Sequence, residues 1–280
     1  MEYISCSDIL IPKLGFGTFA IPIECLKFLI PKALQLGYGL FDTAAKYNNE
    51  EAIGTAIHGS NSYNCLIESK VNAELLKGNL RYLRLNKKSI KTCYKKSCER
   101  IGIPQLDIYL LHSVFDGYEK QFMKLKKMKD DGLVKIIGIC NVTLEQLIQL
   151  NLKTGVHPDI VQVEVHPYFC NKQLLDYCKK NRIAIESRSP FAHGDAMNKW
   201  KKEHVLVEIA KAHECTIPQV ILRWLTQQDI VALPRTTSVE HLKENIESFN
   251  LSLTPVEMAK IDSLDKNMSF GFISTKKINL

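Results

Sequence analysis

Apolar runs of strand length alternate with amphipathic segments along most of this chain. They follow a short opening segment whose sequence, SCSD at residues 5–8, predicts the turn of a hairpin. The runs contain few polar positions, which is typical of parallel strands buried on both faces. They cover residues 13–19, 39–44, 65–71, 106–112, 135–141, 160–166, 183–189 and 230–236.

Segments with helical spacing fill the gaps between these runs, and several begin with a capping residue. Asn49, Thr143, Thr216 and Ser238 each precede such a segment, and Pro218 suits the first turn after Thr216. Alternating strands and helices with short connections favour right-handed crossovers and a parallel sheet. Because eight strands can close on themselves, we expect one domain over residues 1–280, an α/β (β/α)8 TIM barrel with a short N-terminal β-hairpin.

An open, doubly wound sheet is the competing architecture. Such a sheet usually carries a glycine-rich phosphate turn directly after its first strand. The only candidate here, Gly15-Phe16-Gly17-Thr18, lacks a third glycine and is not followed at once by a helix. The barrel is therefore the better prediction.

Polar side chains stand where the predicted strands end. Asp42, Lys70 and His112 close three successive runs, and Tyr47 lies just beyond the first of them. In a barrel these strand ends meet at one mouth, where active sites lie. A carboxylate, a phenol, an ammonium and an imidazole gathered there would suit proton transfer.

Composition and charge narrow the function classes. The 280 residues are 45% hydrophobic and 24% charged, which is ordinary for a soluble globular protein and enough to bury a large core. The net charge of +7 is modest, and its densest stretch, KLKKMKDDGLVKIIG, has helical spacing. We interpret that stretch as a solvated helix face and expect no nucleic-acid partner.

Cysteine usage and the first residues bear on location. The nine cysteines form no C-x-x-C pair and no zinc-like spacing with histidine, so we expect reduced thiols and no metal site. The N-terminus lacks an apolar stretch of signal-peptide length, and nowhere do eighteen apolar residues run together. The sequence therefore predicts a soluble, cytoplasmic protein without a membrane partner.

Seven motifs in this chain resemble the aldo-keto reductase family in order and approximate spacing. They are GFGTF, DTAAKYNNEEAIG, SK at residues 69–70, LDIYLLH, GICN, QVEVHPY and LPRTTSVEHLKENI, which extend from about Lys13 to Phe249. The resemblance implies an NADPH-dependent oxidoreductase that reduces aldehydes or ketones to alcohols. It also implies a catalytic tetrad of Asp42, Tyr47, Lys70 and His112.

This tetrad makes chemical sense for hydride addition to a carbonyl group. Negative charge grows on the carbonyl oxygen, and an acid such as the Tyr47 phenol must supply a proton there. We expect Lys70 to lower the pKa of that phenol and Asp42 to hold the ammonium in place. His112 would donate a second hydrogen bond to the carbonyl oxygen and orient the substrate.

The same resemblance assigns residues to the cofactor. Asn141 and Gln162 would recognise the carboxamide of the nicotinamide, and Gly17 and Thr18 would approach its ribose. Near the 2′-phosphate and adenine the family positions fall on Arg235, Thr236, His241, Glu244 and Asn245. The remaining expected cofactor contacts are Asp42, Cys140, Arg188 and Ser189.

Some positions depart from the family pattern. Cys140 replaces a usual serine, and His241 stands where an arginine often binds the 2′-phosphate. Arg188 replaces the aromatic residue that usually stacks on the nicotinamide. Its guanidinium could stack there instead, or it could turn to a carboxylate such as Glu186. The short tail beyond Asp265 predicts a broad, shallow substrate cleft.

Two other functions remain open at this point. Relatives of this fold include nucleotide-binding regulatory proteins with little turnover, and a barrel enzyme acting on phosphorylated substrates would also use an anion site near the last strand. A complete tetrad favours the reductase. The physiological carbonyl substrate cannot be inferred, because loops set specificity. A monomer is the family's commonest state and is the expected one.

Overall fold

The computed structural model describes residues 1–60, 64–72, 76, 89–194 and 196–271. Within this part of the chain, eight strands form one parallel sheet in chain order, as the sequence predicted. Each lies inside one of the apolar runs. The strands are β3 (Phe16–Gly17), β4 (Leu40–Asp42), β5 (Leu66–Val71), β6 (Ile108–Leu111), β7 (Ile136–Cys140), β8 (Ile160–Glu164), β9 (Ala184–Arg188) and β10 (Ile230–Leu233).

The first and last strands meet and close the sheet into a barrel. Leu14 forms a parallel bridge with Ala232, and the Gly15 N–H donates to the Ala232 carbonyl at 2.9 Å. Two residues further along the chain, the Gly17 N–H donates to the Pro234 carbonyl at 3.0 Å. Backbone hydrogen bonds therefore continue around the ring, and the C-terminal ends of all the parallel strands face one mouth.

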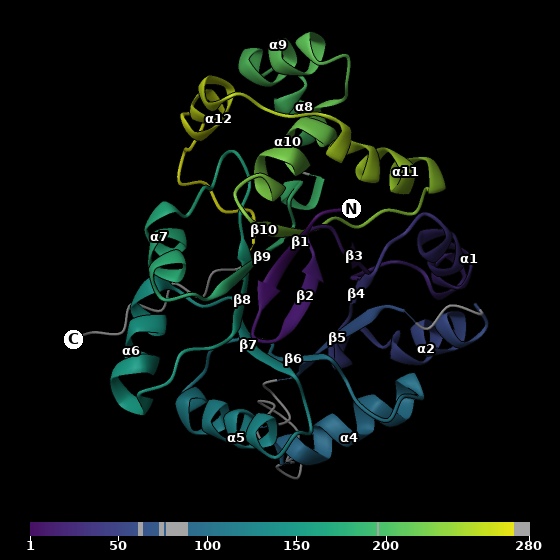
Figure 1. Ribbon diagram of the computed structural model, residues 1–280, viewed down its shortest axis with the longest axis vertical. Coiled ribbons are helices and arrows are strands. Elements are labelled where there is room, and N and C mark those ends of the chain that lie inside the picture. The colour runs from purple at the N-terminus through teal and green to yellow at the C-terminus, as the bar shows by residue number, and fades with distance from the viewer. Residues whose placement is uncertain (61–63, 73–75, 77–88, 195, 272–280) are drawn as a thin grey trace, which may run out of the picture.

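An N-terminal hairpin covers the opposite end of the barrel. Strands β1 (Tyr3–Cys6) and β2 (Ile9–Pro12) pair antiparallel across the predicted turn. In the view down the short axis of the molecule, the hairpin crosses the centre of the ring (Figure 1). Cys6 and Ile11 are buried against Leu40 and Ile108, which begin their strands. The hairpin thus covers the end of the barrel at which the parallel strands begin, opposite the mouth.

Helices surround the sheet (Figure 1). They are α1 (Ile23–Gln35), α2 (Glu50–His58), α4 (Ile90–Ile101), α5 (Tyr118–Asp130), α6 (Leu144–Thr154), α7 (Lys172–Lys180), α8 (Met197–Trp200), α9 (His204–Ala212), α10 (Ile217–Thr226), α11 (Val239–Glu247) and α12 (Pro255–Asp262). The described ranges also contain three short 3-10 turns, η1 (Ala45–Tyr47), η2 (Ala192–Gly194) and η3 (Ser248–Asn250). Among the described residues, no helix is long and apolar enough to cross a membrane.

Most of the predicted helix starts carry the expected caps. Thr143 and Thr216 form capping boxes with the glutamines three residues on, and the Ser238 hydroxyl accepts from a backbone N–H of α11. Asn49 precedes α2 as predicted, but its side chain caps nothing. It is buried and turns toward the strand ends, where two threonines satisfy it better than the helix terminus would.

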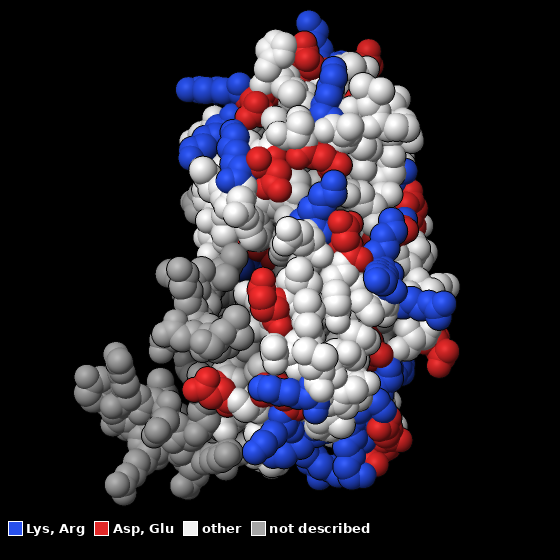
Figure 2. Space-filling view, turned by 90° about the vertical axis from the view of Figure 1, so that its left-hand side faces the viewer, with Lys and Arg blue, Asp and Glu red and all other residues white. Residues whose placement is uncertain are grey.

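The outer surface mixes the two signs of charge. Figure 2 shows Lys and Arg interspersed with Asp and Glu over most of one side of the molecule. Within the lysine-rich stretch, Lys127 pairs with Asp131 at 3.0 Å and Lys129 with Asp159 at 2.6 Å. The first pair is exposed at the end of α5, as expected for a solvated helix face. All nine cysteines carry free thiols.

Helix α2 packs directly against the backbone of α4 at Gly54. A methyl group at this position would lie 1.9 Å from the Ile101 carbonyl oxygen, which belongs to the backbone and cannot turn aside. We predict that Gly54→Ala lowers the free energy of unfolding by about 1–3 kcal/mol. Urea unfolding measures the loss. Gly59→Ala, at a helix end with right-handed backbone angles, is the control and should change stability by less than ~0.5 kcal/mol. Equal effects of the two substitutions would contradict the close contact.

Candidate active site

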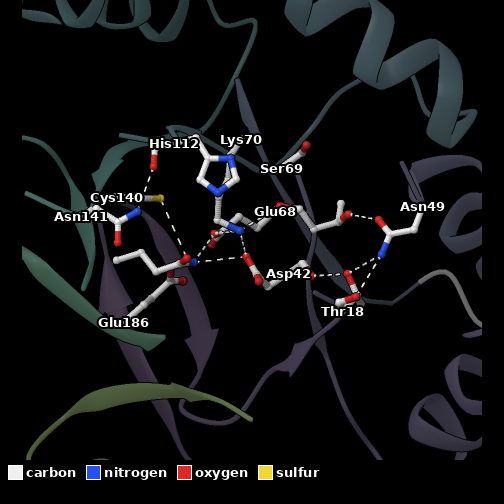
Figure 3. Close-up of polar contacts among 12 residues, drawn as sticks. Thr18, Asp42, Asn49, Glu68, Ser69, Lys70, His112, Cys140, Asn141 and Glu186 are labelled. Carbon is white, nitrogen blue, oxygen red and sulfur yellow. Dashed lines mark hydrogen bonds and ion pairs between the residues drawn. The ribbon is translucent and has the colours of Figure 1, made fainter. Parts of the chain in front are cut away.

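The four residues expected to form the tetrad lie together at the C-terminal mouth of the barrel. The Lys70 ammonium forms an ion pair with Asp42 Oδ1 and donates to the Thr43 carbonyl at 2.8 Å (Figure 3). Its Nζ lies 5.2 Å from the centre of the Tyr47 ring. The rings of Tyr47 and His112 meet edge to face, with centroids 5.5 Å apart. Four side chains from different parts of the chain therefore lie together at the mouth.

Lys70 remains charged although it is completely buried. Burial by itself lowers the pKa of its ammonium group, but Asp42, followed by Tyr47 and Glu68, outweighs burial and holds this pKa well above its usual value. An ammonium ion held in this way is a fixed positive charge beside the phenol.

The pKa of Tyr47 differs from the expectation. Burial raises it and the Lys70 charge lowers it, as predicted, but burial is the larger cause and the net direction is upward. The expectation of a lowered phenol pKa is therefore wrong for this state of the site. The sequence could not show it, because the depth at which Tyr47 is packed depends on contacts between distant elements. The phenol is protonated at neutral pH.

His112 is neutral. Burial first, and then the nearby Lys70 charge, lowers the pKa of its imidazole to about 3. Its Nδ1 has no hydrogen-bond partner among the described residues. A neutral imidazole carries one N–H, so His112 can donate a single hydrogen bond into the mouth without placing a second positive charge beside Lys70.

A buried network behind the tetrad fixes the loop that carries Tyr47. Asn49 accepts from the Thr43 hydroxyl at 2.6 Å and donates to Thr18 Oγ1 at 3.1 Å. Thr18 in turn donates to the Asp42 carbonyl at 2.8 Å. The sequence predicted that Thr18 approaches the cofactor ribose; in the structure its fully buried side chain supports the strand ends. The motif TxxxxxN at 43–49 was the only signal for this network.

A pocket of about 790 Å³ opens above the tetrad. Seven of the predicted cofactor residues line it, together with the tetrad side chains Tyr47 and His112. These seven are Gly17, Asp42, Asn141, Gln162, Arg188, Ser189 and Arg235. Lining residues that the sequence did not single out include Phe19, Phe191, Met197, Phe270 and Gly271. These residues give the wall an apolar part.

Besides Thr18, five predicted cofactor residues do not line this pocket. Cys140 is buried inside the barrel, and Asn245 is buried in α11 and hydrogen-bonded to Tyr38. Glu244 accepts from the Thr216 hydroxyl. Thr236 and His241 lie at the start of α11, with Oγ1 and Nδ1 3.2 Å apart. Apart from Arg235, which lines the pocket, the residues expected at the 2′-phosphate and adenine thus lie outside it, around α11.

Two non-glycine residues of the pocket hold left-handed backbone conformations. Asn141 has a φ of 56° and Ser189 a φ of 53°, directly after β7 and β9. Asparagine tolerates this region, and its side chain here donates to the His112 carbonyl at 3.0 Å. Backbone strain of this kind concentrates at functional sites. The hydrogen bond to the His112 carbonyl also ties the Asn141 amide to the end of β6.

Arg188 turns toward a carboxylate, but to a different one from that predicted. Its Nη2 lies 3.4 Å from Glu164 Oε2, and Glu186 is not its partner. Glu164 also accepts from the Phe270 N–H at 2.7 Å and the Gly271 N–H at 2.9 Å. One carboxylate therefore holds both Arg188 and the C-terminal segment at the rim of the pocket, because that segment folds back onto the end of β8.

Comparison with known proteins gives consistent matches. The sequence profile of the Aldo/keto reductase family matches residues 13–266. Morphine 6-dehydrogenase of Pseudomonas putida is 34% identical over 93% of this chain and 90% of that protein. Glyoxal reductase of Bacillus subtilis (strain 168) is 32% identical over 93% of this chain and 91% of that protein. The crystal structure of a Gox0644 mutant in complex with NADPH has a TM-score of 0.83 at 28% identity, covering 94% of this chain and 93% of that one.

The Glu164 clamp should make stability depend on pH in acid. Burial raises the pKa of this carboxyl, but hydrogen bonds from His166, Ser269 and Phe270 lower it to about 2, below its ordinary value of 4.5. Stability from the clamp is therefore complete above the unfolded pKa and is lost as pH falls toward 2. Between about pH 6 and about pH 3 the loss should be on the order of 2 kcal/mol.

Urea unfolding at about pH 6 and about pH 3 measures this loss. Glu164→Gln should show a smaller difference in unfolding free energy between these two conditions than the wild type. The control Glu145→Gln, on the exposed face of α6, should keep the wild-type difference. An unchanged acid dependence in Glu164→Gln would show that the clamp does not stabilise the fold.

Proposed function

This protein belongs to the aldo/keto reductase family, and we propose that it reduces aldehydes or ketones to alcohols with hydride from NADPH and a proton from Tyr47. One observation carries the proposal. A protonated phenol, a fixed ammonium charge and a neutral imidazole lie together at the closed end of a pocket. These are an acid, a stabiliser of its conjugate base and a donor that orients a carbonyl oxygen.

The pocket suits the proposed cofactor. Its volume of about 790 Å³ is in the range of small-molecule and cofactor sites. Asn141 and Gln162 provide amide groups near the tetrad, where a carboxamide would be recognised. Arg235 lines the pocket and donates from Nη1 to the Phe19 carbonyl at 3.3 Å. It precedes α11 by a few residues in the chain. When bound, NADPH supplies the hydride that adds to the carbonyl carbon.

The side chains of the tetrad perform the proton chemistry. Tyr47 donates its phenolic proton to the carbonyl oxygen, and burial keeps that proton in place until negative charge develops there. Lys70 stabilises the resulting phenolate by its fixed charge, and Asp42 keeps the ammonium oriented. His112 donates its one N–H to the same oxygen and so holds the carbonyl carbon in position.

Substrate class and setting follow from the same features. The apolar wall formed by Phe19, Phe191 and Phe270 suits an apolar or aromatic carbonyl compound, and the name of the Bacillus subtilis relative makes glyoxal a useful first substrate. Nine free thiols support a reducing compartment such as the cytosol. We propose that the protein acts there as a monomer.

Removing the phenolic hydroxyl tests the acid directly. We predict that Tyr47→Phe lowers kcat for NADPH-dependent glyoxal reduction by at least ~10²-fold, because general acid catalysis is lost, while NADPH binding stays within about twofold. Tyr109→Phe is the control, since its buried hydroxyl has no hydrogen-bond partner among the described residues. It should leave kcat unchanged. Retention of more than half the activity by Tyr47→Phe would remove Tyr47 from the role of acid.

Arg235 should determine the preference for the phosphorylated cofactor. A guanidinium can make two hydrogen bonds to a phosphate, so Arg235→Ala should weaken NADPH binding at least ~5-fold and leave NADH binding nearly unchanged. Fluorescence titration with both nucleotides gives the two dissociation constants. Lys243→Ala, which removes an exposed charge on α11, is the control. A parallel loss of NADPH and NADH affinity would assign Arg235 to a different part of the cofactor.

A further inference from the structure

Two glutamates lie inside the barrel beneath the tetrad. Glu68 on β5 and Glu186 on β9 have no exposed surface, and both point into the interior (Figure 3). Much of that interior is apolar, formed by residues such as Leu40, Ile108 and Val231. Carboxyl groups are rarely buried without a partner, so their presence here requires a chemical reason.

One amide nitrogen connects the two carboxyl groups. Gln162 Nε2 lies 2.6 Å from Glu68 Oε1 and 3.1 Å from Glu186 Oε2, so these oxygens are less than about 6 Å apart. The same nitrogen lies 3.2 Å from Asp42 Oδ1, and Lys70 Nζ lies 3.5 Å from Glu68 Oε1. The glutamate pair, Glu68 and Glu186, is thus in direct contact with the tetrad and with the amide that faces the cofactor pocket.

The charges of this cluster do not balance if every carboxyl group is ionised. Three carboxylates would face the single ammonium of Lys70 in a dry interior, where like charges repel strongly. The outer oxygens Glu68 Oε2 and Glu186 Oε1 receive no N–H or O–H from the described residues. A proton on one of the two carboxyl groups halves the excess negative charge and supplies one O–H donor inside the cluster.

We infer that Glu68 and Glu186 share one proton, and that this proton controls how readily Tyr47 gives up its own. The inference rests on the proposed function for its second half. Tyr47 becomes a phenolate when it donates its proton, and the charge of the cluster below it opposes or permits that change. Glu68 and Glu186 act through Lys70 and are positioning residues, since neither lines the pocket.

The groups that face the pair leave few alternatives for titration near neutral pH. They are Asp42 and Lys70 from β4 and β5, Cys140 from β7, Gln162 from β8 and, from the hairpin below, Cys6. Burial raises the pKa of Cys6 to about 12 and that of Cys140 well above its usual value, so both thiols stay neutral. Tyr47 and His112 lie above, and neither changes charge near pH 7.

The pair itself titrates near neutrality. Burial raises the pKa of Glu186 to about 7, and burial together with the charge of Glu186 raises that of Glu68 well above its ordinary value. Loss of the shared proton adds a negative charge below Lys70. The phenolate of Tyr47 is then harder to form, so reduction should slow as pH rises through about 7.

The same titration affects stability with a definite sign. A carboxyl group whose folded pKa is raised contributes stability that is complete below its unfolded pKa and is lost as pH rises through the folded one. Ionisation of the pair should therefore lower the Tm as the pH rises from the ordinary carboxyl pKa of 4.5 to about 7. Glu186→Gln keeps the shape of the side chain and removes the second ionisation.

Infrared titration of the nucleotide-free protein tests the shared proton without any turnover. The wild type should show the carbonyl band of a protonated carboxyl group that disappears near pH 7, and Glu186→Gln should move or remove this change. The Tm of Glu186→Gln should fall less than that of the wild type from about pH 5 to about pH 8. Absence of both effects overturns the shared proton. Glu68→Gln provides the same test if Glu186→Gln does not fold.

The pH profile of kcat tests the link to Tyr47. Wild-type glyoxal reduction should fall several-fold as pH rises through about 7, and in Glu186→Gln this fall should shift by at least ~1 pH unit to the alkaline side. The control Glu50→Gln removes a buried carboxylate that accepts from Ser69 and Arg100 away from the interior pair, and it should keep the wild-type profile. An unshifted profile in Glu186→Gln overturns the link. A wild type that reduces no carbonyl compound while showing the infrared change contradicts the proposed function instead and leaves the shared proton standing.

Discussion

The ammonium group of Lys70 is the constraint to which the rest of the site is adapted, because an unpaired charge inside the barrel would cost several kcal/mol. Asp42 and the Thr43 carbonyl satisfy it from the neighbouring strand end. They can do so only if β4 and β5 pair in the observed register, in which Asp42 lies opposite Glu68. The ion pair therefore links the register of β4 and β5 to the arrangement of side chains at the mouth.

The fixed charge also sets the protonation of its neighbours. Together with burial it keeps His112 neutral, and it opposes the rise that burial causes in the pKa of Tyr47. The phenol is thus a weak acid at rest, beside a cation that favours its conjugate base. Below the ion pair, the glutamate pair adds further negative charge in a medium with little screening. The protonation of this buried cluster therefore sets how much negative charge lies beneath Lys70.

Much of the fold and the tetrad could be predicted from the sequence because both depend on local patterns. Each apolar run became a strand, and the capping residues at Thr143 and Thr216 started helices as expected. In a parallel barrel all strand ends meet at one mouth, so residues that end strands share a site even when they are far apart in the chain. This rule placed Asp42, Lys70 and His112 together.

The parts that could not be predicted depend on side-chain contacts across the barrel. Asn49 looked like a helix cap but binds Thr43 and Thr18, and the partner of Arg188 is Glu164 rather than Glu186. No motif marked Glu68, and Glu186 was considered only as a partner for Arg188. Both contact Gln162, which lies 94 residues after Glu68 and 24 residues before Glu186 in the chain. No local pattern encodes such contacts, because strand register and barrel closure together decide them.

The central claim is that the charged Lys70 and its neighbours support the transfer of hydride from NADPH to a carbonyl carbon, because they stabilise the group that protonates the carbonyl oxygen. The most direct test supplies glyoxal and NADPH carrying deuterium at both C4 positions of the nicotinamide, and analyses the alcohol by mass spectrometry. The wild type should yield alcohol with one deuterium on the former carbonyl carbon, whereas Lys70→Met, checked for folding by circular dichroism, should yield none above background. Alcohol without deuterium, or equal labelled product from both proteins, would contradict the claim.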